Sequence, residues 1–184
     1  MRAASVSIVI AVGLLGIVSF VTTAKARSDI AKRVRAFNER VEPGNLDKGD
    51  EMLMEALHLV QVQLEMYAAN QPKGYYPRCI CNELAGPILF FHLPLNPFAV
   101  KKLPLTFRGW KDLEKLDIAE LPAGTVFYLP ELDDSEHAVG YWLIGIGVKA
   151  PEEPPSLTRK LPGLEDLVAH SLIVLEGYVR KQAG

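Results

Sequence analysis

The sequence predicts an α+β protein: a transmembrane helix, an amphipathic spine helix packed on a small antiparallel sheet, and an extra C-terminal element. An uncharged apolar run opens the chain, and a stripe of apolar residues at helical spacing follows it. Two later segments are rich in β-branched and aromatic residues, as strands are. We divide the chain into a membrane anchor or signal segment, a membrane-proximal helix, a globular domain, and a linker with a C-terminal helix or strand. These are residues 1–26, 27–45, 46–150 and 151–184.

The anchor is predicted from the run Ala3 to Ala24, which carries no charge. A helix of that length covers about 33 Å, enough to cross a hydrocarbon core of about 30 Å. We expect a single-pass protein of the inner or plasma membrane with its body outside the cytoplasm. The alternative is a secreted protein, because small residues flank Lys25 as at a signal-peptide cleavage site after Ala26. The basic flank from Lys25 to Arg40 opposes this orientation under the positive-inside rule.

The membrane-proximal helix is predicted from apolar residues at helical spacing, with basic residues on the other faces. The apolar residues are Ile30, Val34, Phe37 and Val41. We expect this helix to continue the membrane helix outward and to end at Pro43-Gly44. Its basic residues are either solvated or in contact with anionic lipid headgroups.

The spine helix is predicted to begin near Asp50, as its N-cap, and to end before Gln71. Its core side comprises Leu53, Leu57, Val60, Leu64 and Tyr67. Gln63 is expected to lie outside this side.

Five prolines between Tyr75 and Leu105 predict an ordered loop that covers the core, and a short helical turn is expected from Trp110 to Leu116. Residues 125–129 and 139–148 should pair as an antiparallel hairpin around a polar stretch from Glu131 to His137. The C-terminal segment from Leu161 is ambiguous. We favour a helix there, with a closing strand from Ser171 to Val179 as the alternative.

Composition argues against two classes of function. A net charge of −2, with basic residues gathered only in residues 25–40, argues against a nucleic-acid partner. Four scattered histidines, without a phosphate loop or a nucleophile elbow, argue against an enzyme. Cys79 and Cys81 are expected to be partly buried thiols. The alternative is a strained disulfide bridge or a metal contact. The bridge would be strained because an extended backbone holds such a pair too far apart for a relaxed disulfide.

Three segments carry a resemblance to a known family. They are Ala56 to Asn70 with the exit Gly74-Tyr75-Tyr76-Pro77, the loop Leu93 to Phe98, and the strand Tyr141 to Gly147. The chain resembles type IV pilin-like proteins, nearest to the pseudopilins of type II secretion. The resemblance implies a non-catalytic structural or assembly component of a type II secretion or type IV pilus-like apparatus. Its partners would be the membrane and other pilin-like or secretion-apparatus subunits.

The anchor departs from that family. Members carry a prepilin-peptidase site, in which a glycine precedes a large apolar residue and a glutamate follows five positions after the cut. No acidic residue occurs before Asp29. We therefore expect a component that caps, primes or braces an assembly in place of a repeating subunit. The alternative is a free-standing membrane-anchored binding domain of the cell envelope with a pilin-like fold.

The one candidate site is acidic. Major pseudopilins hold calcium in a loop after the sheet hairpin, and oxygen ligands suit this ion. The corresponding residues are Glu131, Asp133, Asp134 and Glu136. A solvated turn is the simpler interpretation, because Asp and Glu favour turns for local reasons. No other cofactor is expected.

Overall fold

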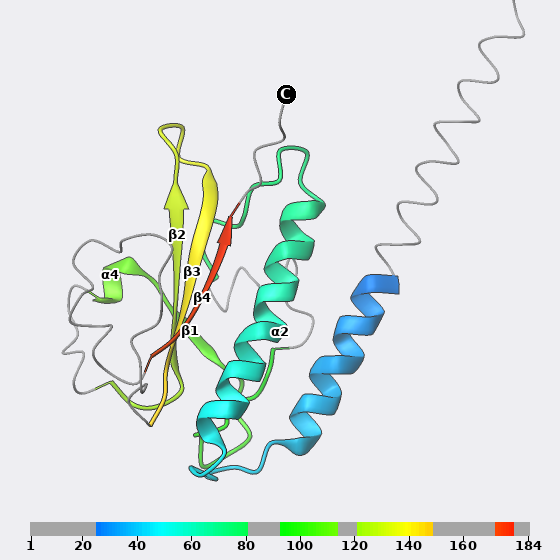
Figure 1. The fold of residues 1–184 in the computed structure, drawn as a ribbon, viewed down its shortest axis with the longest axis vertical. Coiled ribbons are helices and arrows are strands. Elements are labelled where there is room, and N and C mark those ends of the chain that lie inside the picture. Colours follow the sequence, from blue (N-terminus) through cyan, green and yellow to red (C-terminus); the bar gives the residue numbers. More distant parts are fainter. Residues whose placement is uncertain (1–24, 81–92, 114–120, 149–171, 179–184) are drawn as a thin grey trace, which may run out of the picture.

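The computed structural model describes residues 25–80, 93–113, 121–148 and 172–178. The predictions for the apolar run, for Cys81 and for the linker after Pro151 lie outside this part. Within it, no helix is both long and apolar enough to cross a membrane. The protein is α+β, as predicted, and is built in layers: a sheet, the helix α2 (Gly49–Ala69), and an outer helix of residues 25–40, shown in blue (Figure 1).

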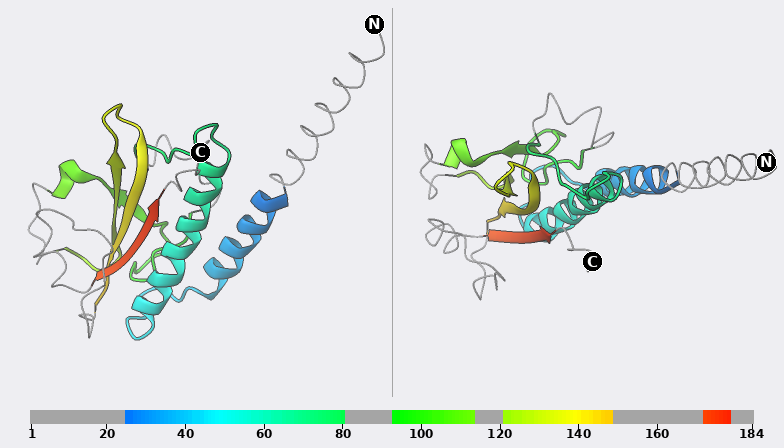
Figure 2. Two further views of the ribbon diagram at one scale, coloured as in Figure 1. Left: turned by 45° about the horizontal axis from the view of Figure 1, so that its top comes forward. Right: turned by 90° about the horizontal axis from the view of Figure 1, so that it is seen from above.

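The outer helix and α2 form a helical hairpin. Residues 25–40 are helical, and the chain then reverses at Pro43-Gly44, where Gly44 has a φ of 75° that glycine adopts without a steric penalty. The two helices run antiparallel, and the outer helix lies on the side of α2 away from the sheet (Figure 2). Its predicted apolar face is confirmed as buried. The four residues are Ile30, Val34, Phe37 and Val41.

Helix α2 is buried on two sides. Leu53, Leu57, Val60 and Leu64 have no exposed surface, which confirms the predicted core side. This side meets strand β3 at Gly145, where an added Cβ would lie 2.8 Å from the Leu57 Cδ1 atom.

A second buried stripe comprises Ala56, Leu59 and Gln63. At 100° per residue it lies roughly a quarter turn around α2 from the sheet side, toward the outer helix. Two predictions are corrected here. Gln63 is buried, with its amide donating to the Leu59 carbonyl at 3.2 Å, whereas Tyr67 in the last turns is only half-buried.

The start of α2 also differs from the prediction. Lys48 occupies the N-cap position without a side-chain capping bond, so Asp50 is not the N-cap. The Asp50 carboxylate instead accepts a hydrogen bond of 2.7 Å from the Val148 N–H, just after β3. Its negative charge in the first turn still complements the positive end of the helix dipole. Asp50 therefore joins the start of α2 to the end of the sheet hairpin.

Within the described residues, the sheet has four strands in the order β1 (Thr106–Arg108), β2 (Thr125–Leu132), β3 (Ala138–Ile146) and β4 (Leu172–Tyr178). The predicted hairpin of β2 and β3 is confirmed as antiparallel, with a bulge at Glu131/Leu132. Strand β1 pairs with β2 in parallel, so the sheet is mixed and the purely antiparallel prediction is wrong. The connection between them contains the short helix α4 (Trp110–Leu113), within the predicted helical turn. Three residues are too few to give a recognisable strand pattern, which is why β1 was missed.

The favoured C-terminal helix is wrong for residues 172–178, where the alternative strand is found. Strand β4 pairs antiparallel with β3, with Tyr141 opposite Gly177. A Cβ at Gly177 would lie 2.1 Å from the Tyr141 ring, so glycine leaves the space which that ring fills. β-branched Ile173 and Val174 suit a strand locally, and pairing with β3 decides between the two interpretations.

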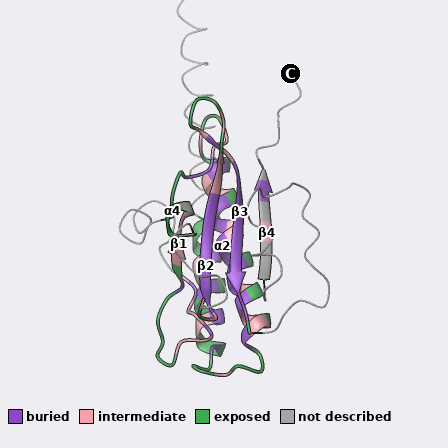
Figure 3. Cartoon of the chain, turned by 90° about the vertical axis from the view of Figure 1, so that its left-hand side faces the viewer, coloured by how far each residue is buried: buried purple, intermediate pink, exposed green. Residues whose placement is uncertain are grey.

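Both faces of β2 and β3 are buried (Figure 3). Val126, Tyr128, Tyr141 and Leu143 belong to the cluster shared with α2. Phe127, Leu129, Trp142 and Ile144 are buried as well, and alternation along a strand places them on the opposite face. The hairpin is thus the centre of the sheet and provides the platform for α2.

We predict that Leu64→Ala lowers the free energy of unfolding by about 2–5 kcal/mol, through lost burial and a residual cavity. Exposed His58 on the same helix is the matched control, and His58→Ala should cost under about 0.5 kcal/mol. Urea unfolding of the detergent-solubilised chain, followed by tryptophan fluorescence, measures both values. Equal losses would show that the core side of α2 is misassigned.

Candidate functional site

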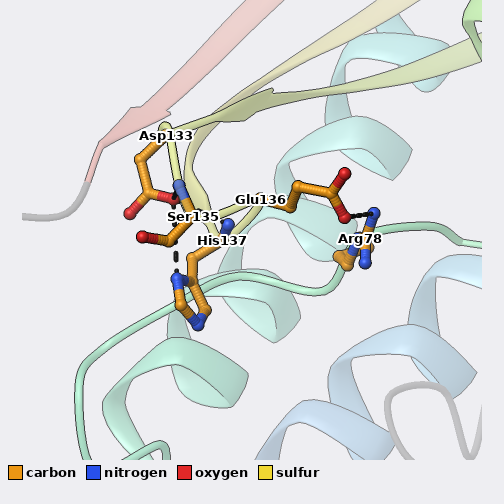
Figure 4. A network of polar contacts seen from close by, with 5 residues as sticks. All are labelled: Arg78, Asp133, Ser135, Glu136 and His137. Carbon is orange, nitrogen blue, oxygen red and sulfur yellow. Dashed lines mark hydrogen bonds and ion pairs between the residues drawn. The ribbon is translucent and has the colours of Figure 1, made fainter.

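The acidic stretch forms the tip of the β2–β3 hairpin (Figure 4). The Asp133 Oδ1 atom accepts hydrogen bonds from the backbone N–H groups of Ser135 at 2.9 Å and His137 at 2.8 Å. The Asp133 N–H donates to the His137 carbonyl, and the Glu136 N–H donates to the Asp133 carbonyl, each at 2.9 Å. Glu136 takes a φ of 61° to close the turn. The Asp133 carboxylate thus organises the tip from inside.

These contacts account for the ionisation of Asp133. The His137 N–H is the largest cause that lowers its pKa below the ordinary value of 3.8, and the Ser135 N–H and the nearby imidazole add to it. The His137 ring lies with its Nδ1 atom 3.5 Å from the carboxylate and stacks on the Tyr75 ring at 4.4 Å. The Tyr75 segment is therefore held against the hairpin tip.

The four predicted calcium ligands do not converge. Glu136 is paired with Arg78, 3.0 Å from its guanidinium, and Asp133 is engaged by the turn. Glu131 lies within β2 opposite Gly140, and Asp134 is exposed in the turn. Among the described residues, no group of three or more His, Cys, Asp or Glu side chains is arranged to hold a metal ion. The geometry of the tip therefore matches the turn interpretation and lends no support to the calcium site.

Cys79 is exposed, which corrects the expectation of a partly buried thiol.

A polar cluster that the sequence did not reveal joins α2, the Tyr-Pro exit and β3. The Glu65 carboxylate accepts hydrogen bonds from the Tyr76 hydroxyl at 3.0 Å and the Tyr141 hydroxyl at 3.0 Å. The Tyr76 and Tyr141 rings meet edge to face with centroids 4.8 Å apart. Tyr128 beside them donates to the Pro77 carbonyl at 2.7 Å. Burial, followed by the charge of Glu65, raises the pKa of Tyr76 and of Tyr141 well above the ordinary value of 10.0.

The loop Leu93 to Phe98 ties the layers together. The Asn38 side chain of the outer helix accepts from the Leu95 N–H at 2.8 Å and donates to the Leu93 carbonyl at 3.4 Å. The Phe98 ring fills the space above Gly49, where an added Cβ would lie 2.2 Å from the ring. This loop therefore fixes both helices of the hairpin to the sheet domain.

No protein-family model, curated protein or solved structure matches the chain. The three family-like segments occupy linked positions in the fold. The Tyr-Pro exit holds α2 to β3, the loop from Leu93 holds the outer helix, and the strand from Tyr141 carries Gly145 beneath α2.

We predict that the Asp133 carboxyl titrates below 3.8 in a pH series of NMR spectra. Because folding keeps this group ionised, its contribution to stability is complete above the ordinary pKa and is lost as the pH falls through the lowered one. His137→Gln keeps the backbone donor, so most of the shift should persist in this control. A titration at or above the ordinary value would contradict the turn geometry.

We predict that Tyr141→Phe lowers the free energy of unfolding by about 1–2 kcal/mol, because one bond to a charged acceptor is lost. Tyr76→Phe should cost a similar amount, and the double variant should be non-additive because both hydroxyls share the Glu65 carboxylate. Wild-type stability should fall as the pH rises above 10.0, since the folded chain keeps phenol protons that the unfolded chain releases. Additive losses from urea unfolding would show that the two hydroxyls act separately.

Proposed function

We propose that the chain is a membrane-anchored, pilin-like component of a type II secretion or type IV pilus-like assembly, with its body outside the cytoplasm. Its role is structural. The observation that carries the proposal is the packing of α2 on the β2–β3 hairpin, closed by the Tyr-Pro exit at Tyr76. The resemblance implies that arrangement of helix, exit and hairpin, and an apolar run long enough for an anchor precedes it in the sequence.

The chemistry of the described residues supports a scaffold. The described groups with shifted pKa values are three buried tyrosines, whose hydroxyls donate to Glu65 or to the Pro77 carbonyl, and one aspartate that closes a turn. Burial and the contacts between α2, the Tyr-Pro exit and the hairpin account for each of these pKa shifts. In an enzyme, perturbed groups gather in a cleft beside a nucleophile or a base. The cluster around Glu65 instead braces the layer between helix and sheet.

The helical hairpin supports a capping, priming or bracing role over that of a repeating subunit. The resemblance implies one long unbroken helix, in which no second helix would fold back over the outer side of α2. Here the outer helix covers that side of α2, and Asn38 and an Arg40–Glu55 ion pair hold it in place. Less of α2 is left for packing into a filament. The absence of an acidic residue before Asp29 points the same way, because a carboxylate compensates the amino terminus of the family's repeating subunits.

The second candidate is a free-standing envelope domain. The same fold-back favours it, because a body that buries its own helix needs no neighbour to cover it.

We predict that a membrane-impermeant amine cross-linker added to spheroplasts captures the chain with a polytopic assembly protein or a pilin-like subunit. Deletion of the gene should reduce secretion or pilus display. Leu64→Asp is the matched control, since it keeps the apolar run but places an unpaired charge in the core of the body, and it should lose the partners. Quantitative mass spectrometry of the captured material provides the measurement.

Two outcomes would contradict parts of this proposal. Capture of the chain alone, without a secretion defect on deletion, would support the free-standing domain. Cross-linking only by a membrane-permeant reagent would place the body in the cytoplasm, on the side that the basic flank favours.

A further inference from the structure

We infer that the first half of the outer helix is a docking surface for an anionic phospholipid bilayer, with Lys25, Arg27, Lys32, Arg33 and Arg35 as the headgroup-binding residues. The inference rests on the proposed membrane attachment and adds to it the class of lipid and the residues that recognise it.

The fold presents these side chains outward. Ile30, Val34 and Phe37 are buried against the body, and this fixes the rotation of the outer helix about its axis. All five basic residues are exposed as a result. One face of the outer helix is therefore buried in the core, and the basic residues lie on its solvent-exposed faces.

Most of these cations have no ion-pair partner among the residues that the structure describes. Lys32 lies 4.0 Å from Asp29, a distance at the limit of an ion pair. Among the described residues, no carboxylate pairs with Lys25, Arg27, Arg33 or Arg35. The basic residue farther along the helix is different, because Arg40 is paired with Glu55 of α2. The first half of the helix thus keeps its guanidinium and ammonium groups available for phosphate oxygens.

Charge is segregated along the helical hairpin. Residues 25–36 carry five basic and one acidic side chain, whereas residues 37–55, around the turn, carry two basic and six acidic side chains. An anionic surface attracts the basic residues 25–36 and repels the acidic residues 37–55, so the electric field of the surface orients the molecule. The attracted end is also the one that the apolar run of residues 3–24 adjoins in the sequence.

The distances suit a bilayer surface. Arg35 lies ten residues after Lys25, which is about 15 Å along a helix. The headgroup layer is about 5–7 Å thick on each side of the hydrocarbon core, and the surface potential extends a further Debye length of about 8 Å. For a membrane whose hydrocarbon core ended at Ala24, the basic residues from Lys25 to Arg33 would lie within about 14 Å of it and so within reach of its field, even for an upright helix. Arg35, at about 16 Å, comes within reach when the helix tilts toward the surface.

The acidic tip of the β2–β3 hairpin affects how the body tilts on an anionic surface. It lies at the end of the sheet toward which the start of the outer helix is directed, with α2 between the sheet and that helix (Figures 1 and 2). Glu136 there is paired with Arg78, and Asp133 is engaged by the turn, while Asp134 is exposed. An anionic surface consequently favours a tilt that brings the outer helix down and lifts the tip of the sheet.

The test uses the full chain in lipid nanodiscs, with a bimane fluorophore attached through Ala36→Cys in a Cys79→Ser, Cys81→Ser background. Ala36 is exposed on the outer helix beside the basic residues. Quenching by a lipid with a nitroxide on its headgroup reports how close the helix lies to the surface. We expect about twofold stronger quenching in discs with about 30% phosphatidylglycerol than in pure phosphatidylcholine, and loss of the difference in about 0.5 M NaCl.

Arg33→Glu with Arg35→Glu should abolish the dependence on phosphatidylglycerol. Lys101→Glu with Lys102→Glu makes the same change in net charge on an exposed loop elsewhere and should preserve it. Equal quenching in both kinds of disc, in a chain that co-purifies with them, would overturn the lipid inference and leave the proposed function standing. A chain that co-purifies with neither disc would overturn the membrane attachment and the inference together.

Discussion

The burial of α2 on two sides is the constraint on which the rest of the structure depends. Each fully buried leucine on its sheet side contributes about 1.5–3 kcal/mol relative to exposure, and four large apolar residues lie there without exposed surface. The close fit requires small residues where the layers meet. A Cβ at Gly145 would touch Leu57, and one at Gly147 would lie 2.3 Å from the Asp50 carboxylate. Because α2 fills the space between two layers, displacement of either layer uncovers it.

Local pattern identified the elements whose apolar or β-branched residues recur within one continuous segment. The apolar faces of both helices and the pairing of β2 with β3 follow from their periods, and the structure contains all three. Gln63 was misplaced because a single-stripe interpretation assumes a helix with one partner, whereas the outer helix provides a second. Strand β4 was underestimated for a related reason. Its stability comes from seven register pairs with β3, which no local window contains.

For the polar sites as well, some features follow from neighbouring residues in the sequence, and others depend on residues that only the fold brings together. The acidic stretch was recognised from composition, but its chemistry depends on which backbone N–H groups point at Asp133, and only the folded turn determines this. The cluster around Glu65 combines residues 65, 76 and 141, so no spacing within one segment could reveal it. A Tyr-Pro exit after the helix was the one available signal, and its tyrosine proves to be a member. Sequence thus identified one participant, and the fold supplied the other two.

The reversal of the chain at Gly44 also determines how far the body extends from its attachment. Placed end to end, the outer helix and the 21 residues of α2 would extend about 55 Å, whereas folded back they extend about 32 Å, the length of α2 alone. Anchored by residues 3–24, the protein would be a low body held close above the bilayer, without a stalk. With the proposed anchor, any macromolecule that meets the body would come within that height of the lipid.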